Sequence, residues 1–312
     1  MSIFLDFDGT ITTEDTVTHL ANFALRFQSE RRHRQDNTTT TTTTTSAAPA
    51  RTPTSSQNLS QQQETGDLSS RWEKVVNAYI TDYRSHVSAY EPCASDRQCE
   101  EDEVTFLRSQ KNVETRSLGR LNECALFRGI SRAAFRQAGR ELVRDGTVRL
   151  RPGFSEFVRK GLAKGWRVHV VSVNWSAAFI EGACGFAEGE VSVFANEVRE
   201  GDGAVLGPRI LGGDRNLTNS CDKLDVVRAI MREQGAQGKP SFYFGDSTTD
   251  MECLLVATQG VVMADTEDST LIQTLRRIGK EVLHVRDAGA TKGLVWASNY
   301  EEAMTRFELD LE

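Results

Sequence analysis

The sequence lacks any long hydrophobic run: none of its 312 residues falls in an apolar stretch of the length that a membrane helix requires, about 18 residues. It also lacks the apolar segment of a secretory signal, because Asp6 and Asp8 interrupt its first residues. It has no basic excess, since 37 Lys and Arg stand against 44 Asp and Glu, a net charge of −7. We therefore expect a cytoplasmic protein and leave open its presence in the nucleus as well. We expect no membrane or nucleic-acid partner.

Cysteine is sparse and irregularly placed. The six cysteines show no repeated spacing, and no histidine stands near enough to the closest pair, Cys93 and Cys99, to suggest a zinc site. We interpret all six as reduced thiols, as in most intracellular proteins. With 38% hydrophobic and 26% charged residues, the chain suits one large globular domain, or a core domain with a smaller companion.

Large apolar residues are almost missing from one internal stretch, residues 28–70. This stretch is rich in Thr, Ser and Gln. Such a composition cannot build a packed core, so we predict a disordered low-complexity insert. A basic cluster, RRHR at 31–34, opens it. The cluster is either a solvated run of charges or a docking or localisation signal.

Apolar residues on both sides of this insert recur with helical spacing. The periodicity predicts helices at 16–27, 72–83, 101–127 and 131–143. From Arg151 onward, helical patterns alternate with short apolar runs at 166–173, 241–246 and 260–265. Such runs are typical of strands buried on both faces of a parallel sheet. The sequence therefore predicts an α/β fold, a doubly wound parallel sheet, with a helical region at 16–148.

Polar residues stand at the ends of three predicted strands. Asp6 follows IFL, Ser172 follows VHVV, and Asp246 follows SFYFG. Because the carboxyl ends of parallel strands meet at the edge of the sheet where ligands bind, we expect these side chains to lie close together. Carboxylates directly after buried strands are costly unless a cation binds them. This edge is therefore the candidate site.

Phosphoryl transfer through a covalent aspartate requires groups of this kind. Asp6 is the candidate nucleophile, and Asp8 is placed to protonate the leaving oxygen and then to deprotonate the attacking water. Mg²⁺ held by Asp6, Asp246 and water would cancel the repulsion between these carboxylates and a phosphate. Ser172 and a lysine such as Lys223 would bind the phosphoryl oxygens.

The same residues resemble the four motifs of the haloacid dehalogenase superfamily. These are DFDGT at 6–10, Ser172 at a strand end, Lys223 on a helix, and GDSTTD at 245–250, in that family's order. The resemblance covers about half of the chain, residues 1–15 and 150 to about 266. The segments RPGF and FANEV, on either side of the second motif, resemble the phosphoserine phosphatase-like branch. A second aspartate in the first motif fits phosphatases better than dehalogenases.

The resemblance implies roles for individual residues. Asp6 would be nucleophile and metal ligand, and Asp8 the general acid and base, with its main-chain carbonyl on the metal. Thr10 and nearby backbone amides would hold the phosphate, with Ser172 donating to it and Lys223 neutralising charge. Asp246 would bind the metal, and Asp250 would either bind it or orient its ligands. Asp15 would either contact the substrate or cap the helix that follows it.

The spacing of the motifs implies a cap. The first and second motifs are 166 residues apart (172 − 6), whereas the second and third are 51 apart (223 − 172). In this superfamily an insertion after the first motif implies a helical cap over the active site, which selects small substrates. We expect residues 1–15 and 149–312 to form the core and 16–148 the cap, which contains the insert.

One departure from the phosphoserine phosphatases concerns the second motif. The sequence reads SVNWS, so Val173 and Asn174 stand where a pair of glycines is usual. Side chains there narrow the pocket and disfavour phosphoserine itself, and we count Asn174 among the substrate-binding residues. Trp175 either stacks on the substrate or packs beneath the cap.

The sequence thus predicts a Mg²⁺-dependent phosphatase that hydrolyses a small phosphorylated metabolite through an aspartyl-phosphate intermediate. A phosphotransferase that uses the same intermediate remains open. So does a non-catalytic regulator or scaffold that keeps the fold and uses the insert for interactions, although intact Asp6, Asp8, Lys223 and Asp246 weigh against it. Lys292, in ATKG, is a weaker alternative to Lys223 because it follows the fourth motif.

Overall fold

A parallel seven-stranded sheet forms the centre of the protein in the computed structural model, which describes residues 1–41, 56–187, 189–287, 289 and 293–309. The strand order is β3-β2-β1-β6-β7-β9-β8, and every neighbouring pair is parallel. The strands are β1 (Ser2–Leu5), β2 (Arg167–Val171), β3 (Ser192–Phe194), β6 (Ser241–Gly245), β7 (Gln259–Met263), β8 (Leu283–His284) and β9 (Gly293–Ala297). A two-stranded hairpin, β4 (Glu197–Val198) and β5 (Val205–Leu206), lies apart from the sheet.

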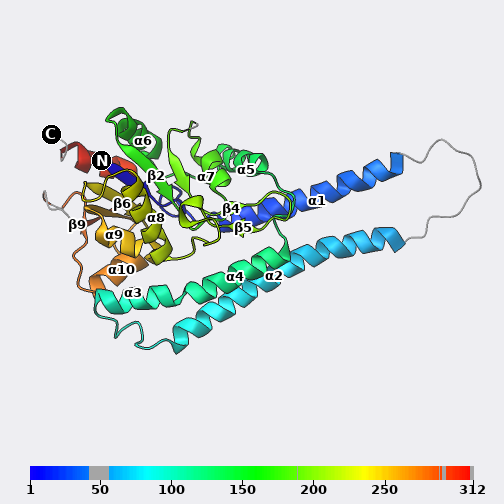
Figure 1. Ribbon diagram of the computed structural model, residues 1–312, viewed down its shortest axis with the longest axis horizontal. Coiled ribbons are helices and arrows are strands. Elements are labelled where there is room, and N and C mark those ends of the chain that lie inside the picture. The colour runs from blue at the N-terminus through cyan, green and yellow to red at the C-terminus, as the bar shows by residue number, and fades with distance from the viewer. Residues whose placement is uncertain (42–55, 188, 288, 290–292, 310–312) are drawn as a thin grey trace, which may run out of the picture.

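Both faces of this sheet are buried under helices. In β1, Ile3 and Leu5 belong to one apolar cluster and Phe4 to the other, as alternating side chains of a strand should. The first cluster includes residues of α5, α6, α7 and α11, and the second includes residues of α3, α8, α9 and α10. The predicted doubly wound α/β fold is therefore confirmed (Figure 1).

The helices of the core follow the expected alternation with the strands. They are α6 (Phe154–Ala163), α7 (Ala177–Cys184), α8 (Ser220–Glu233), α9 (Met251–Val256), α10 (Thr270–Arg277) and α11 (Tyr300–Leu309), with short 3₁₀ turns η1 (Arg209–Leu211) and η2 (Thr248–Asp250). The edge strands β3 and β8 and the strand β9 were not predicted. Two of them have only two or three residues, too few for an alternating pattern to be recognised.

The segment after the first strand is helical, as predicted. It contains α1 (Val17–Thr41), α2 (Ser56–Ala89), α3 (Glu100–Ser109), α4 (Lys111–Cys124) and α5 (Arg132–Arg144). The single helix expected at 101–127 is in fact two, α3 and α4, which meet at Gln110. Helices α2 and α4 run side by side, whereas α5 packs against α7 of the core (Figure 1). The cap boundary at residue 148 stays a prediction.

Helices α1 and α2 extend into the two flanks of the predicted insert, 28–41 and 56–70. Helix α1 continues through the first flank and α2 begins in the second, so both project from the body (Figure 1). Adding residues to an existing helix is easier than starting a new one. Each helix is attached to the body near its projecting part: Gln28 of α1 donates to Leu126 O, and Leu68 of α2 is buried. The prediction for 42–55 lies outside the described residues.

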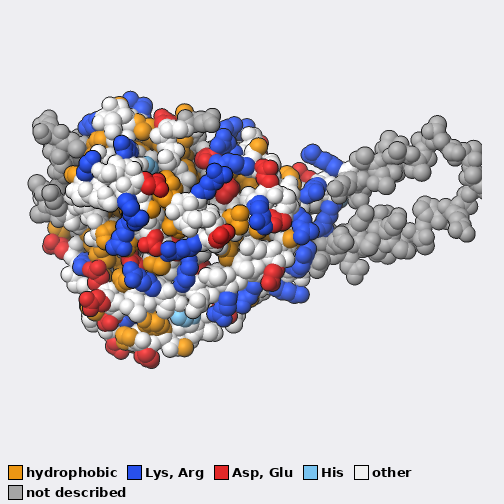
Figure 2. Space-filling model, in the orientation of Figure 1, with side chains coloured by type: hydrophobic (Ala, Val, Ile, Leu, Met, Phe, Trp, Pro, Cys, Tyr) orange, Lys and Arg blue, Asp and Glu red, His pale blue; other side chains and the backbone are white. Residues whose placement is uncertain are grey.

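Lys and Arg side chains gather where α1 and α2 leave the body (Figure 2). In the basic cluster at 31–34, Arg31 and Arg34 are exposed, and Arg31 Nη1 donates to Arg128 O at 3.4 Å. Docking or localisation by this cluster stays a prediction. Among the described helices, none combines the length and the apolar character needed to span a bilayer.

Candidate active site

The register of three adjacent strands brings the predicted residues to one edge. Leu5 of β1 pairs with Val170 of β2 on one side and with Phe244 of β6 on the other. Asp6, Ser172 and Asp246 therefore leave the sheet within about one residue of the same level. Ser172 is fully buried, and its backbone N–H donates to Phe194 O at 3.0 Å.

Lys223 joins the nucleophile candidate to the fourth motif. Its Nζ lies 2.7 Å from Asp6 Oδ2 and 2.7 Å from Asp250 Oδ1, and the lysine side chain has no exposed surface. Asn219 caps helix α8 and accepts the backbone N–H of Asp222, which places Lys223 in the first turn. Burial alone would lower the pKa of Lys223, but the charges of Asp250 and Asp6 outweigh it, so the pKa is raised. Lys223 is therefore charged.

Three carboxylates form a compact acidic cluster. Oxygens of Asp6, Asp246 and Asp250 lie within 4.8 Å of one another. Burial raises the pKa of Asp6 well above its usual range and the charge of Asp250 adds to this, while Lys223 opposes both. Burial and the charge of Asp250 likewise raise the pKa of Asp246 to about 7. One lysine is thus too little positive charge for the cluster, and an all-oxygen donor set suits Mg²⁺.

Asp250 differs from Asp6 and Asp246 because each of its two oxygens accepts at least two hydrogen bonds. Oδ1 accepts from Lys223 and, at 2.7 Å, from the hydroxyl of Tyr243. Oδ2 accepts the backbone N–H groups of Asp246 and Ser247, each at 3.2 Å. Asp250 therefore holds Lys223 and the motif loop in place, and this arrangement favours the orienting role over direct metal binding. Asp6 and Asp246 are the better placed ligands.

The residues expected to hold phosphate make other contacts in this structure. Thr10 Oγ1 donates to Asp246 Oδ1 at 2.9 Å, and Gly9 N–H donates to Thr12 Oγ1 at 3.1 Å. Thr10 therefore fixes the orientation of Asp246. Phosphate contacts by Thr10, Gly9 and Ser172 stay predictions.

Asp8 is held by residues from two separate segments. Thr16 donates to Asp8 Oδ1 through its backbone N–H at 2.8 Å and its hydroxyl at 2.6 Å. Asn174 Nδ2 donates to Asp8 Oδ2 at 2.9 Å. Burial and the nearby charge of Asp15 raise the pKa of Asp8 to about 6, although the hydrogen bonds from Thr16 and Asn174 oppose this. A pKa in that range suits a residue that both donates and accepts protons near neutral pH.

Arg151 is a residue of this site that sequence reasoning missed. Its guanidinium is buried, and Nε and Nη2 donate to Gly9 O at 3.0 and 2.9 Å. Its Nη1 donates to Asp265 Oδ1 at 2.7 Å and to Ser298 O at 2.9 Å. Arg151 thus ties the first-motif loop to the end of β9. The RPGF segment was the available signal, but sequence alone does not show what its arginine contacts.

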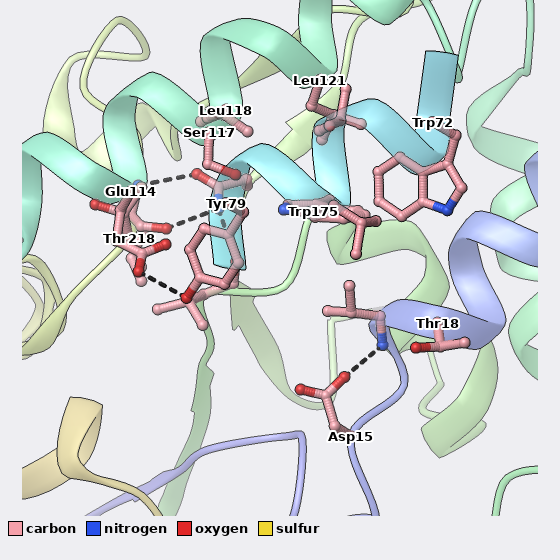
Figure 3. Close-up of a pocket in the computed structure, with 16 residues that line it drawn as sticks. Asp15, Thr18, Trp72, Tyr79, Glu114, Ser117, Leu118, Leu121, Trp175 and Thr218 are labelled. Atoms are coloured by element: carbon pink, nitrogen blue, oxygen red, sulfur yellow. Dashed lines mark hydrogen bonds between the residues drawn. The ribbon is translucent and has the colours of Figure 1, made fainter. Parts of the chain in front are cut away.

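A cavity of about 420 Å³ lies between the core and the cap helices (Figure 3). Val173 and Trp175, on either side of Asn174, form part of its core wall, and Trp72, Tyr79 and Glu114 come from α2 and α4. Asp6, Asp8, Asp246 and Asp250 are not among the residues that line it. The remaining lining residues are Asp15, Val17, Thr18, Val75, Val76, Ser117, Leu118, Leu121, Asn196, Leu217 and Thr218.

Two open questions about the cavity residues are answered in part. Trp175 packs beneath the cap, with its ring 6.0 Å from that of Trp72 and 5.8 Å from that of Phe127, and it also faces the cavity. Asp15 Oδ1 accepts the backbone N–H of Val17 at 2.7 Å, as a helix cap does, while the residue also lines the cavity. Lys292 lies outside the described residues.

Tyr79 and Glu114 supply the polar surface of the cavity on the cap side. The Tyr79 hydroxyl donates to Glu114 Oε1 at 3.0 Å (Figure 3). Burial raises the pKa of Glu114, and the hydrogen bond from Tyr79 and the charge of Lys111 oppose this. The cavity therefore combines aromatic walls with a carboxyl group at one end.

Residues 104–255 match the family model of the haloacid dehalogenase-like hydrolases. Over 293 residues the chain is 25% identical to the "Bifunctional TH2 protein, mitochondrial" of Arabidopsis thaliana. This alignment covers 89% of the chain and 40% of the relative. Over 176 residues it is 29% identical to a CTO1 family protein of Schizosaccharomyces pombe, covering 51% of this chain and 61% of the relative. The chain thus spans less than two thirds of either relative.

Solved structures show a weaker likeness. A phosphoserine phosphatase with a phospho-aspartyl intermediate analogue aligns over 97% of this chain and 96% of its own, with a TM-score of 0.47 and 12% identity. Cytosolic 5'-nucleotidase IIIB bound to cytidine aligns over 100% and 88%, with a TM-score of 0.44 and 13% identity. The matched family model spans the second, third and fourth motifs, and the structure joins them to the first. The chain thus resembles the haloacid dehalogenase-like hydrolases, in the residues that the family model matches and in the arrangement of all four motifs.

Proposed function

We propose that the protein is a Mg²⁺-dependent phosphatase that hydrolyses a small phosphomonoester through an aspartyl-phosphate intermediate. The observation that carries this proposal is the contact of Asp6 with a buried lysine, beside Asp246 and two positions before Asp8. A scaffold protein would have no need to keep such a costly set of buried charges. The complete set therefore favours catalysis over the regulatory alternative.

The proposed reaction has two displacements on phosphorus. In the first, an Asp6 carboxylate oxygen bonds to phosphorus while the ester P–O bond breaks, and Asp8 gives its proton to the leaving alkoxide. In the second, Asp8 takes a proton from water, whose oxygen bonds to phosphorus as the Asp6–phosphate bond breaks. Lys223 stabilises the negative charge on Asp6 and on the transferring group throughout.

Asp6 and Asp246 are the side chains that would hold Mg²⁺, with the Asp8 carbonyl as the ligand implied by the resemblance. The raised pKa values of Asp6 and Asp246 show that this pair of carboxylates lacks positive charge. When bound, the ion would offset that repulsion and polarise the phosphoryl oxygens.

The cavity between core and cap suits the organic part of the substrate. It adjoins Val173 and Trp175, on the loop that also carries Ser172. Aromatic walls favour a flat group, and the carboxyl groups of Glu114 and Asp15 disfavour one that carries its own negative charge. We therefore infer a phosphate ester of a flat alcohol that is neutral or cationic. Phosphoserine, with its carboxylate, fits this cavity poorly.

The first test is hydrolysis of a generic aryl phosphate by Asp6→Asn. Because the nucleophile is removed, we expect a loss of kcat by at least about 1,000-fold, with the melting temperature nearly unchanged. Asp145→Asn, at an exposed aspartate after α5, is the matched control and should keep full activity. Activity of Asp6→Asn close to that of the wild type would contradict the proposed nucleophile.

Metal and substrate tests complete the design. EDTA should abolish turnover and added Mg²⁺ should restore it, whereas indifference to chelation would contradict the metal requirement.

A panel of phosphomonoesters tests the substrate preference inferred from the cavity. It pairs esters of flat neutral or cationic alcohols with esters of anionic ones, phosphoserine among them. The flat, non-anionic esters should show the higher kcat/KM, and a preference for the anionic set would contradict the inferred substrate class.

A further inference from the structure

Asn174 is buried at the centre of a fixed set of hydrogen bonds. Its side chain has no exposed surface. Nδ2 donates to Asp8 Oδ2 at 2.9 Å and to Thr16 Oγ1 at 3.1 Å, while Oδ1 accepts the backbone N–H of Ser176 at 3.2 Å. Because a backbone N–H can only donate, Oδ1 must face Ser176 and Nδ2 must face Asp8. The amide therefore has one orientation.

The backbone of Asn174 is held as firmly as its side chain. Its N–H donates to Ser172 Oγ at 3.2 Å, and its carbonyl accepts from the backbone N–H of Asn196 at 3.2 Å. The side chain of Asn196 also donates to Val173 O at 3.1 Å and to Leu217 O at 2.8 Å. The second-motif loop thus presents the Asn174 amide to Asp8 from a rigid support.

The Asp8 carboxylate has one oxygen with a lone-pair position left for proton transfer. A carboxylate has about four lone-pair positions, two on each oxygen. Oδ1 accepts twice from Thr16, so both of its positions are filled. Oδ2 accepts once, from Asn174, so one position stays open. The proton that Asp8 transfers therefore belongs on Oδ2.

We propose that Asn174 and Thr16 are positioning residues that hold Asp8 Oδ2 toward the leaving oxygen of the substrate. This inference rests on the proposed phosphatase activity and assigns Asn174 a different task from the substrate contact expected from sequence. Without Nδ2, only the contacts of Thr16 with Oδ1 hold the carboxyl group, so Oδ2 is less well fixed and proton delivery becomes less frequent. Thr16 precedes α1, so the same contact joins the acid to the start of the cap segment.

The leaving group of the substrate provides the test. The 4-nitrophenolate ion leaves without a proton, whereas a benzyl alkoxide needs one, so the first displacement depends on a well-placed Asp8 only with benzyl phosphate. The constant kcat/KM reports that first displacement, because the later attack of water on the aspartyl phosphate is common to both esters. For Asn174→Ala we expect kcat/KM for benzyl phosphate to fall about 10- to 100-fold, and kcat/KM for 4-nitrophenyl phosphate to fall less than about threefold. Asp8→Asn sets the upper limit of this contrast.

A second pair of variants decides the case if Asn174→Ala fails to fold. Thr16→Val removes the hydroxyl donor but keeps the backbone donor, so it should show the same contrast at smaller size, and Thr16→Ser should restore the wild-type ratio. Asn216→Ala removes a partly buried amide that donates to Val205 O, outside this network, and should leave the ratio unchanged.

The outcomes separate the two proposals. An equal loss on both esters in Asn174→Ala and Thr16→Val would assign these residues a structural role and overturn the inference. Undiminished benzyl phosphate hydrolysis in either folded variant would do the same. Wild-type protein that hydrolyses neither ester, nor any phosphomonoester of the panel, would overturn the proposed function itself.

Discussion

Lys223 shows how the site tolerates several aspartates. It is fully buried and lies 2.7 Å from carboxylate oxygens of both Asp6 and Asp250. Asp250 is in turn fixed by the Tyr243 hydroxyl and two backbone N–H groups, so the lysine cannot move toward either partner alone. Removal of Lys223 itself would leave the buried carboxylates without a cation, which costs several kcal/mol of stability, on the order of 3–5. Asp6 and Asp250 therefore share the positive charge of one lysine, which both of them hold in place.

Gly9 allows the first and fourth motifs to approach each other. Its φ of +69° lies in the left-handed region, and a Cβ there would overlap the Asp246 carboxylate. For Gly9→Ala we therefore expect displacement of Asp246, with kcat reduced by at least about 100-fold and weaker activation by Mg²⁺. Steady-state kinetics over a Mg²⁺ titration is the measurement.

Gly165→Ala is the matched control for that variant. Gly165 has a similar φ of +74°, but a Cβ there would meet open space. It should lose stability by about 1 kcal/mol through backbone strain and keep its activity. If both variants lost activity equally, strain and not the crowding of Asp246 would be the cause.

At the scale of elements, ion pairs join the cap helices to the core. Arg108 of α3 pairs with the buried Glu252 of α9 at 2.5 Å, and Glu252 also accepts from Ser220 Oγ at 2.9 Å. Lys111 of α4 pairs with Asp222 of α8 and donates to Asn216 O at 3.1 Å. Helices α3 and α4 are therefore fixed on the core at their junction, beside the helix that carries Lys223.

The projecting parts of α1 and α2 should be dispensable for catalysis. Replacing residues 36–66 with a flexible Gly/Ser linker keeps the described contacts of these helices with the body, those of Gln28 and Arg31 in α1 and of Leu68 in α2. We expect kcat within about twofold of the full chain, since no cavity or site residue is removed. Kinetics of both proteins on the same ester is the measurement.

A larger deletion tests the same boundary from the other side. Removing 29–70 also removes Leu68, which is 5% exposed and belongs to the main apolar cluster. Burying a leucine contributes about 2 kcal/mol, so this deletion should lower the melting temperature where the shorter one does not. Loss of activity in the shorter deletion would show that the projecting helices take part in the cap.

At the scale of the whole molecule, the sheet places Asp6, Ser172 and Asp246 at one edge and leaves the interior of the strands to packing. His169 illustrates the second part. It lies inside β2 between the rings of Phe4 and Phe194 and is buried, so it is a packed core residue. Its ring also contacts Gln234 Nε2 at 3.1 Å.

The burial of His169 predicts a pH dependence of global stability. Burial lowers the pKa of His169 to about 4, against an ordinary value of 6.5. The unfolded chain then binds a proton that the folded chain does not, so stability is full above about pH 6.5 and falls as the pH drops toward 4. Between pH 7.5 and 5 we expect His169 alone to contribute a loss of about 2 kcal/mol. The raised pKa values of Asp8 and Asp246 contribute in the opposite direction, so the effect of His169 is the difference between the wild type and a His169 variant.

Urea unfolding at both pH values measures this loss. His169→Gln should be less stable at pH 7.5 but should lose less on acidification, because it has no ring to protonate. His33→Gln, at an exposed histidine of α1, should behave like the wild type. An unchanged pH dependence in His169→Gln would assign the acid sensitivity to other groups.

The sequence by itself determined the alternation of helices and strands and the residues that end β1, β2 and β6. It did so because the apolar runs and the carboxylates that follow them are local features. Asp6, Ser172, Lys223 and Asp246 were predicted on that ground, and their roles in catalysis stay predictions. The helices in the flanks of the insert do not follow from local pattern, because the contacts that anchor Gln28 and Leu68 are made with distant parts of the chain.

Only the tertiary structure decided what each polar side chain touches. Asn174 lies 166 residues from Asp8 in the sequence yet donates to it, and Arg151 lies 142 residues from the Gly9 carbonyl that it holds. Asp250 could be taken for a metal ligand until its two oxygens were seen to be occupied. Local patterns fix which residues are at the edge of the sheet, but hydrogen bonds have direction and short range, so their partners follow only from the folded backbone.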